Sequence, residues 1–160
     1  MNIVVEQVNY QDSKACDELV QLLDNYASDP MGGGQPLSDF TRTNLAAKLA
    51  DIDGAVSLLA RIDERPVGFA NCFQGFSTFS CAPLLNIHDI AVEEAYRGRG
   101  IAAKLLDEIA SVASERGCCK VTLEVLTGNV TAKSVYLRAG FRPSADGESH
   151  GPYEFWDCPL

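Results

Sequence analysis

The sequence predicts an α/β fold in which a mixed sheet is covered by helices. Some short segments alternate apolar and polar residues with a period of two, while others repeat apolar residues at helical spacing. The two kinds of segment follow one another in the order β-α-α-β-β-β-α-β-α-β, with no internal repeat and no break in composition. A chain of 160 residues is long enough to bury one core, so we expect a single domain over residues 1–160.

Strands are predicted where β-branched and aromatic residues gather between turn signals. The stretch 83–92 is nearly continuous in apolar residues, which is typical of a strand buried on both faces. The sequence DERP at 63–66 fits a tight turn between two neighbouring strands. The predicted strands are 2–8, 55–62, 67–79, 83–92, 120–126 and 153–160.

Helices are predicted from apolar residues three and four positions apart and from residues that favour helix ends. Ser38 is placed to cap the N-terminus of the second helix, and Gly117 to stop the third. Three successive glycines and two prolines make 26–36 a loop. The predicted helices are 11–25, 38–50, 100–117 and 129–140.

Composition restricts the classes of partner. The formal net charge of −9 argues against nucleic-acid binding, which needs a basic face. No apolar run of 18 residues and no signal-peptide pattern is present, so we expect a cytoplasmic protein with no membrane partner. The six cysteines are scattered without C-x-x-C spacing, and there are two histidines, so no metal site is predicted.

A short basic stretch, EEAYRGRGIAAKLL at 93–106, stands out in this acidic chain. A helix beginning near Gly100 presents unpaired backbone N–H groups and the positive end of its dipole. Gly98 lacks a Cβ that would keep an anion away, and Arg97 and Arg99 add positive charge. The stretch therefore predicts a phosphate cradle, although neither the Walker A nor the dinucleotide pattern is present. The simpler alternative is a glycine turn with two solvated arginines.

Two motifs then point to a family. YRGRGIA at 96–102 resembles the R-x-x-G-x-A signature of the GNAT superfamily of N-acetyltransferases, and NVTAKSVYLRAGF at 129–141 is similar to its N-x-x-A-x-x-x-Y-x-x-x-G-F run. The order of predicted strands and helices is also that of GNAT proteins. The resemblance implies an acyl-CoA N-acyltransferase fold, with about six to seven strands and four helices. It also implies acetyl-CoA as cosubstrate.

The resemblance assigns the cofactor-binding residues. The backbone of the strand before the basic stretch would pair with the pantetheine amides, backbone N–H groups of the basic stretch would hold the pyrophosphate, and two residues of the last helix would contact the cofactor arm. These residues are Ile90, Ala91, Val92, Arg97, Gly98, Arg99, Gly100, Ile101, Ala102, Asn129 and Lys133.

The resemblance also implies a catalytic acid. Tyr136 would donate a proton to the departing thiolate; the alternative is a tyrosine that only packs between helix and sheet. His88 is our candidate for the base that deprotonates the amine, against a hydrogen-bonded core histidine. Asp89, Glu124 or a water molecule remain alternatives, and strand alternation places Asp89 on the face opposite His88.

The acceptor site is expected between the first two helices, the hairpin and the end of the chain. Aromatic side chains would wall an apolar slot, carboxylates would attract an ammonium group, and the glycine run would let the loop approach a ligand. Core packing and a plain connector are the competing interpretations of these features. The candidates are Tyr26, Asp29, Gly33, Phe76, Phe79 and Asp89.

The predicted function is therefore acetyl transfer from acetyl-CoA to the primary amine of a small molecule, by direct attack. A protein or peptide N-acetyltransferase is one alternative, and a non-catalytic acyl-CoA-binding sensor is another. By resemblance we also expect a homodimer. The sequence does not name the acceptor amine.

Overall fold

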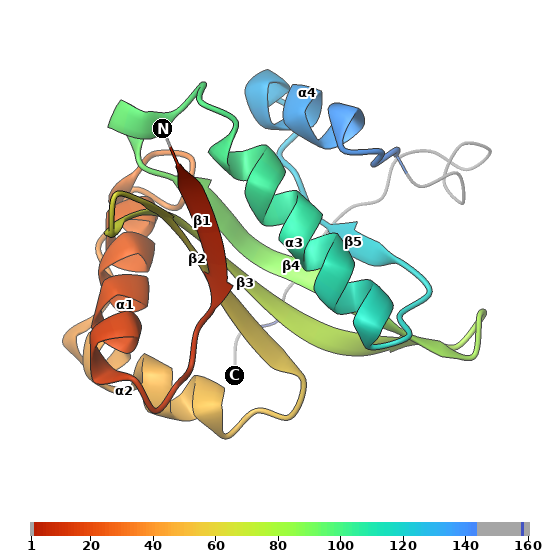
Figure 1. Cartoon of the computed structure of the whole chain (residues 1–160), viewed down its shortest axis with the longest axis horizontal. Helices are drawn as coiled ribbons and strands as arrows, with labels where there is room; N and C mark the ends of the chain where they lie inside the picture. The colour runs from red at the N-terminus through yellow and green to blue at the C-terminus, as the bar shows by residue number, and fades with distance from the viewer. Residues whose placement is uncertain (1, 144–157, 159–160) are drawn as a thin grey trace.

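The computed structural model describes residues 2–143 and residue 158, and they form a five-stranded sheet (Figure 1). The strands lie side by side in chain order, each antiparallel to the next except for β5, which is parallel to β4. Their bounds are β1 Ile3–Gln7, β2 Ala55–Ile62, β3 Arg65–Ser77, β4 Ala82–Val92 and β5 Val121–Leu123.

The predicted order of elements is confirmed from β1 to the last helix. The helices are α1 Ser13–Ser28, α2 Asp39–Ala50, α3 Ile101–Glu115 and α4 Val130–Arg138, with a short 3₁₀ turn at Glu94–Tyr96. The sixth predicted strand, 153–160, falls outside the described residues apart from Cys158. Within the described part, no helix is both long and apolar enough to span a bilayer.

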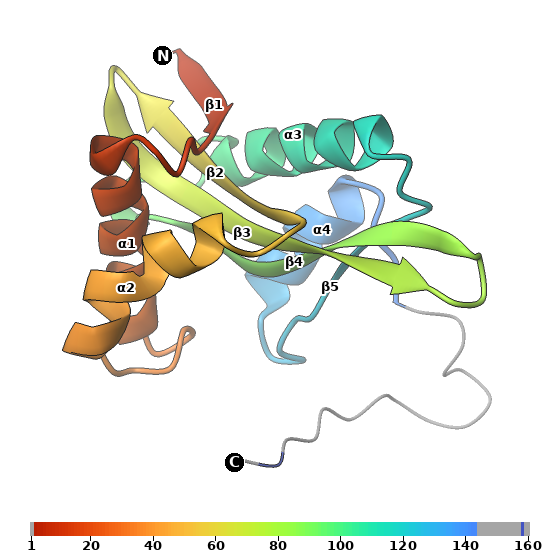
Figure 2. The same cartoon turned by 90° about the horizontal axis from the view of Figure 1, so that it is seen from below.

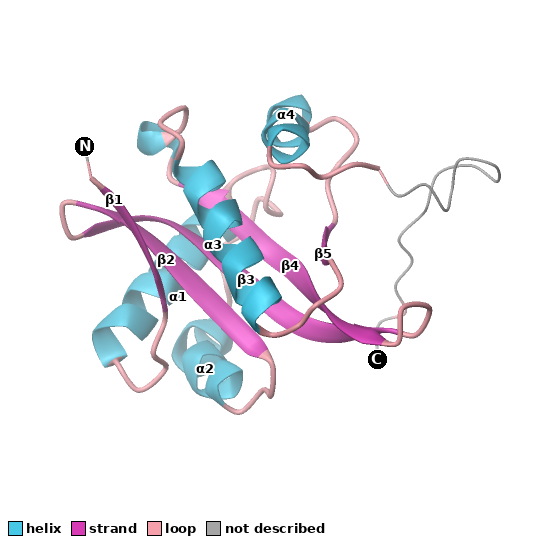
Figure 3. Ribbon diagram, turned by 45° about the vertical axis from the view of Figure 1, so that its right-hand side comes forward, coloured by secondary structure: helices cyan, strands magenta, loops and turns pink. Residues whose placement is uncertain are grey.

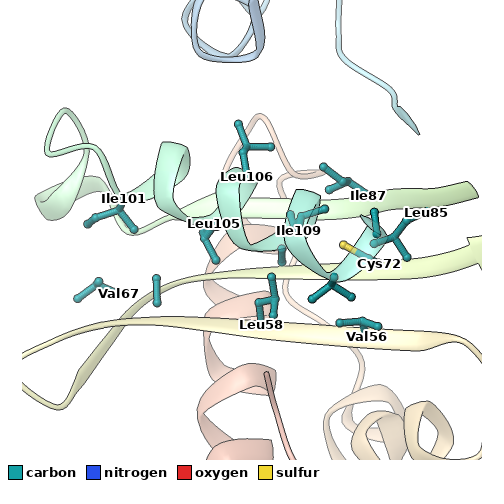
Figure 4. Close-up of a cluster of buried hydrophobic side chains, with 14 of the residues drawn as sticks. Val56, Leu58, Val67, Cys72, Leu85, Ile87, Ile101, Leu105, Leu106 and Ile109 are labelled. Atoms are coloured by element: carbon teal, nitrogen blue, oxygen red, sulfur yellow. The ribbon is translucent and has the colours of Figure 1, made fainter. Parts of the chain in front are cut away.

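The sheet separates two cores. Helix α3 covers one face, while α1 and α2 pack on the other (Figure 2). On the α3 face, Leu105 and Ile109 of the helix meet Leu58, Val67 and Leu85 of the strands (Figure 4), and all five are almost completely buried. This burial holds the N-terminus of α3 at the end of β4.

Three sequence predictions need correction. Helix α1 continues to Ser28 rather than stopping at residue 25, because Tyr26 packs edge-on against Phe69 of β3 with ring centroids 6.2 Å apart. Strand β5 ends at Leu123, three residues before the predicted end. Strand β4 is only partly buried, because its second half has no neighbour on the β5 side.

Candidate active site

The second half of β4 has an open edge. Parallel pairing with β5 stops at Ile87–Leu123, whereas pairing with β3 continues to Gly68–Val92. Strand β5 itself ends there, the chain that follows it leads away toward α4 (Figure 3), and residues 88–92 have no β5 partner in the described chain. Unpaired strand backbone of this kind can accept an extended ligand that carries amide groups.

The open edge leads to the N-terminus of α3. Gly98 and Gly100 have φ angles of 77° and 81°, which only glycine adopts readily, and Gly100 is the N-cap residue. In the part of the chain that the structure describes, the backbone N–H groups of residues 98–103 donate to no other protein group. The residues present therefore fit the predicted phosphate cradle.

Arg97 has hydrogen-bond partners within the chain. Its backbone N–H donates to the Glu94 carbonyl at 3.2 Å, so it is not available to a phosphate. Its side chain donates to the Val92 carbonyl at 3.0 Å and to the Asp29 carboxylate at 3.1 Å. Arg97 thus ties the basic stretch to the end of α1, 68 residues away in the sequence. Arg99 lies over the Tyr96 ring, 5.2 Å from its centroid.

Asp29 is also occupied. Its carboxylate accepts the Met31 backbone N–H at 2.8 Å and the Arg97 guanidinium at 3.1 Å, and these two hydrogen bonds lower the pKa of Asp29, the Met31 bond most. The predicted attraction of a substrate ammonium therefore competes with a cation already in place. The backbone carbonyl of Asp29 accepts hydrogen bonds from the N–H groups of three successive glycines, 32–34, and so shapes their turn.

Two hollows lie beside β4. The outer cleft, of about 640 Å³, runs between the C-terminal end of α1 and the end of β4. The inner cavity, of about 360 Å³, lies between α1, α2 and the middle of β3 and β4. Tyr26 lines both hollows. The inner cavity is lined by Leu23, Tyr26, Ala27, Gly32, Leu37, Thr41, Leu45, Leu49, Asn71, Phe73, His88 and Asp89.

His88 and Asp89 both face the inner cavity, which corrects the expectation that they lie on opposite faces. Asn71 pairs with Asp89 and Cys72 with Ile87, so His88 is an extra residue in β4. Such a bulge breaks the alternation of side chains and turns two successive residues to one side. His88 is exposed rather than in the core, and its ring meets Phe73 edge-on, with centroids 5.7 Å apart.

Tyr136 is half-buried between α4 and the α3-side core, with Phe141 against its ring. Burial raises its pKa, and the nearby Tyr26 raises it further. Burial also raises the pKa of Tyr26, followed by the negative charge of Asp89. The carboxylate of Asp89 therefore lies near the Tyr26 phenol, and Tyr26 lies near Tyr136.

Residues at the start of helix α4 make hydrogen bonds that stabilise the helix and the loop before it. The Asn129 side chain accepts the Ala132 N–H at 3.1 Å and so caps the helix, while Lys133 Nζ donates to the Thr127 carbonyl at 3.0 Å. The side-chain contacts of Asn129 and Lys133 within the described chain are thus to the helix and to the loop before it.

Some predicted acceptor residues do not reach either hollow. Phe76 and Phe79 lie at the tip of the β3–β4 hairpin, with 60% and 99% of their surface exposed. The hairpin projects beyond the helices (Figure 2), and this explains their exposure. Gly33 lines neither hollow, whereas Gly32 does, and a Cβ on Gly32 would lie 2.0 Å from the Tyr26 carbonyl oxygen.

Sequence reasoning missed Asn71 and Phe73, which line the inner cavity from β3. Glu124, an alternative base, lies beyond the end of β5 and lines neither hollow. Alternation along β3 marks Asn71 as an inward polar residue among apolar ones. This alternation can be seen in the sequence, but it does not reveal which residue of the neighbouring strand pairs with Asn71.

An open edge of β4 that leads to a glycine-rich helix N-terminus is the arrangement that the resemblance to N-acyltransferases implied. The model of the Acetyltransferase (GNAT) family matches residues 18–141. The chain therefore belongs to the GNAT family, as its motifs predicted.

Similar proteins include acetyltransferases named for small amines. The chain is 30% identical over 92 residues to thialysine N-epsilon-acetyltransferase of Bos taurus, covering 58% of this chain and 50% of that protein. It is 30% identical over 113 residues to L-2,4-diaminobutyric acid acetyltransferase of Streptomyces avermitilis, covering 68% and 62%. The chain thus spans about half to three fifths of the length of these relatives.

Solved structures share the whole fold. A probable acetyltransferase superposes with a TM-score of 0.79 at 25% identity, covering 100% of this chain and 98% of that one. An aminoglycoside acetyltransferase in complex with sisomicin gives 0.77 at 18% identity, covering 99% and 97%. The second likeness supports the fold alone.

Proposed function

We propose that this protein transfers the acetyl group of acetyl-CoA to the primary amine of a small molecule. The observation that carries this proposal is the open edge of β4 at residues 88–92, which continues into the unpaired N–H groups of residues 98–103. A strand-like pantetheine arm followed by a pyrophosphate has the matching sequence of hydrogen-bonding groups. The inner cavity beside this edge offers a volume suited to a small acceptor.

In this proposal the backbone N–H and C=O of Ile90, which point away from β3, hold the pantetheine amides, whereas those of Ala91 face Phe69 of β3. The Val92 carbonyl, which already accepts from Arg97, is left out of that role. The N–H groups from Gly98 to Ala102 hold the pyrophosphate. Arg97 keeps this stretch attached to α1, and Arg99 supplies positive charge at the rim.

Acetyl-CoA supplies the acetyl thioester, and the acceptor amine forms the new C–N bond as the C–S bond breaks. Tyr136 gives its phenolic proton to the sulfur, so that the thiol leaves neutral. His88 takes the proton that the amine loses, and its exposure lets it return that proton to solvent. An acceptor that binds as an ammonium ion loses one proton to His88 before the attack and a second to solvent as the amide forms. Tyr136 regains its proton from solvent, so the sum of the steps releases one proton.

The direct test is calorimetric titration of the protein with acetyl-CoA, followed by assays of thiol release with a panel of amines. We expect binding of acetyl-CoA, and release of one thiol for each amide formed. Binding without release for any amine would favour a sensor, and release only with peptides would favour a protein acetyltransferase. Failure to bind acetyl-CoA would contradict the proposal as a whole.

A further inference from the structure

A hydrogen-bonded row of polar side chains, with its two middle members Ser57 and Asn71 buried, crosses the sheet beside the inner cavity. Ser57 of β2 is the register partner of Asn71 of β3, and Asn71 is the partner of Asp89 of β4. Ser57 and Asn71 are only 2% and 3% exposed. Three adjacent strands therefore place a polar residue at the same level on the face covered by α1 and α2.

The hydrogen bonds in this row have a definite direction. Asn71 Nδ2 donates to Asp89 Oδ2 at 3.1 Å, and Ser57 Oγ donates to Asn71 Oδ1 at 2.7 Å. Because the Ser57 hydroxyl proton is used there, the Tyr10 hydroxyl must be the donor in its 2.9 Å contact with Ser57 Oγ. The reverse orientation of the Asn71 amide would set its oxygen against the carboxylate.

The row cannot carry a proton, because an amide group lies in its middle and does not exchange protons readily. It can hold a carboxylate in place, since the amide donor at 3.1 Å restricts the rotation of the Asp89 side chain. In the described chain every buried side-chain polar atom has a partner, so the row is satisfied along its length.

The surroundings of Asp89 limit what the carboxylate can meet. Most of the inner cavity is apolar, with leucines from α1, α2 and their connection and with Phe73 at one wall. None of its described lining residues is lysine or arginine, and residues 144–160 contain neither type in the sequence. A carboxylate on the acceptor would therefore meet the charge of Asp89 with no lysine or arginine of the described lining to offset it.

We propose that Tyr10, Ser57 and Asn71 are positioning residues that fix Asp89 as the ammonium-binding group, and that the inner cavity selects apolar monoamines without a carboxylate, such as aryl-alkyl amines. This inference rests on the proposed acetyl transfer and names its acceptor class. The ammonium pairs with Asp89, and the apolar body lies among the leucines. The relatives named for thialysine and diaminobutyrate act on amino acids, so this chain would differ from them in acceptor.

The test compares phenethylamine with phenylalanine, which differ only by the carboxylate. We expect kcat/KM to be at least about tenfold higher for phenethylamine. Asn71→Leu and Asp89→Asn should each raise the KM for phenethylamine about tenfold or more, because a hydrogen bond or ion pair to a charged group is lost. The KM for acetyl-CoA and the kcat should stay within about twofold.

The positioning role makes a graded prediction. Ser57→Ala should raise the KM less than Asn71→Leu does, and Tyr10→Phe least of all, since each lies one hydrogen bond further from Asp89. Ser77→Ala is the matched control, because it removes a buried hydroxyl that lies in β3 and outside the row. This variant should leave the KM for phenethylamine unchanged. A merely structural role would lower thermal stability in the variants without this gradient. If Asn71→Leu does not fold, the KM values of Asp89→Asn and Ser57→Ala for phenethylamine test the positioning role in its place.

Binding separates this inference from the proposed function. Phenethylamine is titrated calorimetrically into the wild-type protein and into Asp89→Asn, both saturated with CoA. Binding lost in Asp89→Asn supports the inference, even if no acetyl transfer is seen and the proposed function fails. Equal binding of phenylalanine, or binding unaffected by Asp89→Asn, would overturn the inference while acetyl transfer could still stand.

Discussion

Tyr136, the general acid of the proposed mechanism, carries its phenol in a half-buried environment. Its ring packs against Phe141 and the α3-side core, and this burial raises the pKa of its phenol above the ordinary value of 10.0. The neutral, proton-bearing form therefore persists through the neutral and mildly alkaline range. A proton donor is needed in that form, so its environment suits a general acid.

Replacement of Tyr136 by phenylalanine should lower kcat about 10²-fold, because the ring remains and only the donated proton is lost. The dissociation constant for acetyl-CoA should change less than about twofold. Steady-state kinetics and calorimetry measure the two effects. Tyr96→Phe is the control, since it keeps the ring that Arg65 and Arg99 cover. A kcat equal to that of the wild type would remove Tyr136 from the mechanism.

The pH dependence of kcat follows from the same residue. A general acid loses function when it deprotonates, and its raised pKa moves that loss to higher pH. We expect no fall in the kcat of the wild-type protein on the alkaline side until the pH exceeds about 10. A pH–rate profile measured with saturating substrates checks this, and an alkaline fall centred near pH 8 would contradict the assignment.

Helix α3 has glycines at both ends, but they serve different purposes. Gly100 caps the N-terminus with φ of 81°, and Gly117 follows the C-terminus with φ of 67°. A Cβ on either would meet no atom within 4 Å, so an alanine would cost only backbone strain. The N-terminal glycine alone lies where we propose that the pyrophosphate binds.

This difference gives a matched pair of substitutions. Gly100→Ala and Gly117→Ala should each lower the free energy of unfolding by about 1 kcal/mol, because both adopt a left-handed conformation. Only Gly100→Ala should weaken acetyl-CoA binding, since its methyl group would crowd the N–H groups of the cradle. Urea denaturation and calorimetry measure the two quantities. Equal affinities in the two variants would show that the cradle is not the binding site.

The protein as a whole buries several weak acids in their neutral form. Burial raises the pKa of Cys72 from an ordinary 9.0 to about 12, and burial likewise raises the pKa of Cys16, Tyr10 and Tyr26. In the unfolded chain these groups ionise at lower pH than in the folded protein. The stability that they contribute is therefore complete below pH 9 and is lost as the pH rises.

Cys72 permits a test of this effect. Between about pH 9 and 12 the unfolded thiol is ionised and the folded one is not, so it should contribute a fall of about 1.4 kcal/mol per pH unit. Cys72→Val keeps the side chain apolar and removes that part of the slope. Chemical denaturation of both proteins at pH 8, 9 and 10 measures it. Equal slopes in the two proteins would contradict a buried neutral thiol at this position.

Local signals explain why much of the fold could be predicted. Ser38 accepts the Thr41 N–H at 3.1 Å as a helix cap, and Gly117 and Gly140 have positive φ angles just after their helices. Each of these depends on neighbours within one or two turns. The end of α1 could not be placed in this way, because a contact between Tyr26 and Phe69, 43 residues later in the sequence, extends it.

The sequence by itself determined the family, the order of elements and the glycine-rich N-terminus of α3, because each is written in short, contiguous patterns. Only the tertiary structure decided how the site is assembled. The bulge that turns His88 and Asp89 to one side, the bond from Arg97 to Asp29, and the row from Tyr10 to Asp89 all join residues of different elements. Strand register and helix packing set these contacts, and neither is encoded in the spacing of residues along a single segment.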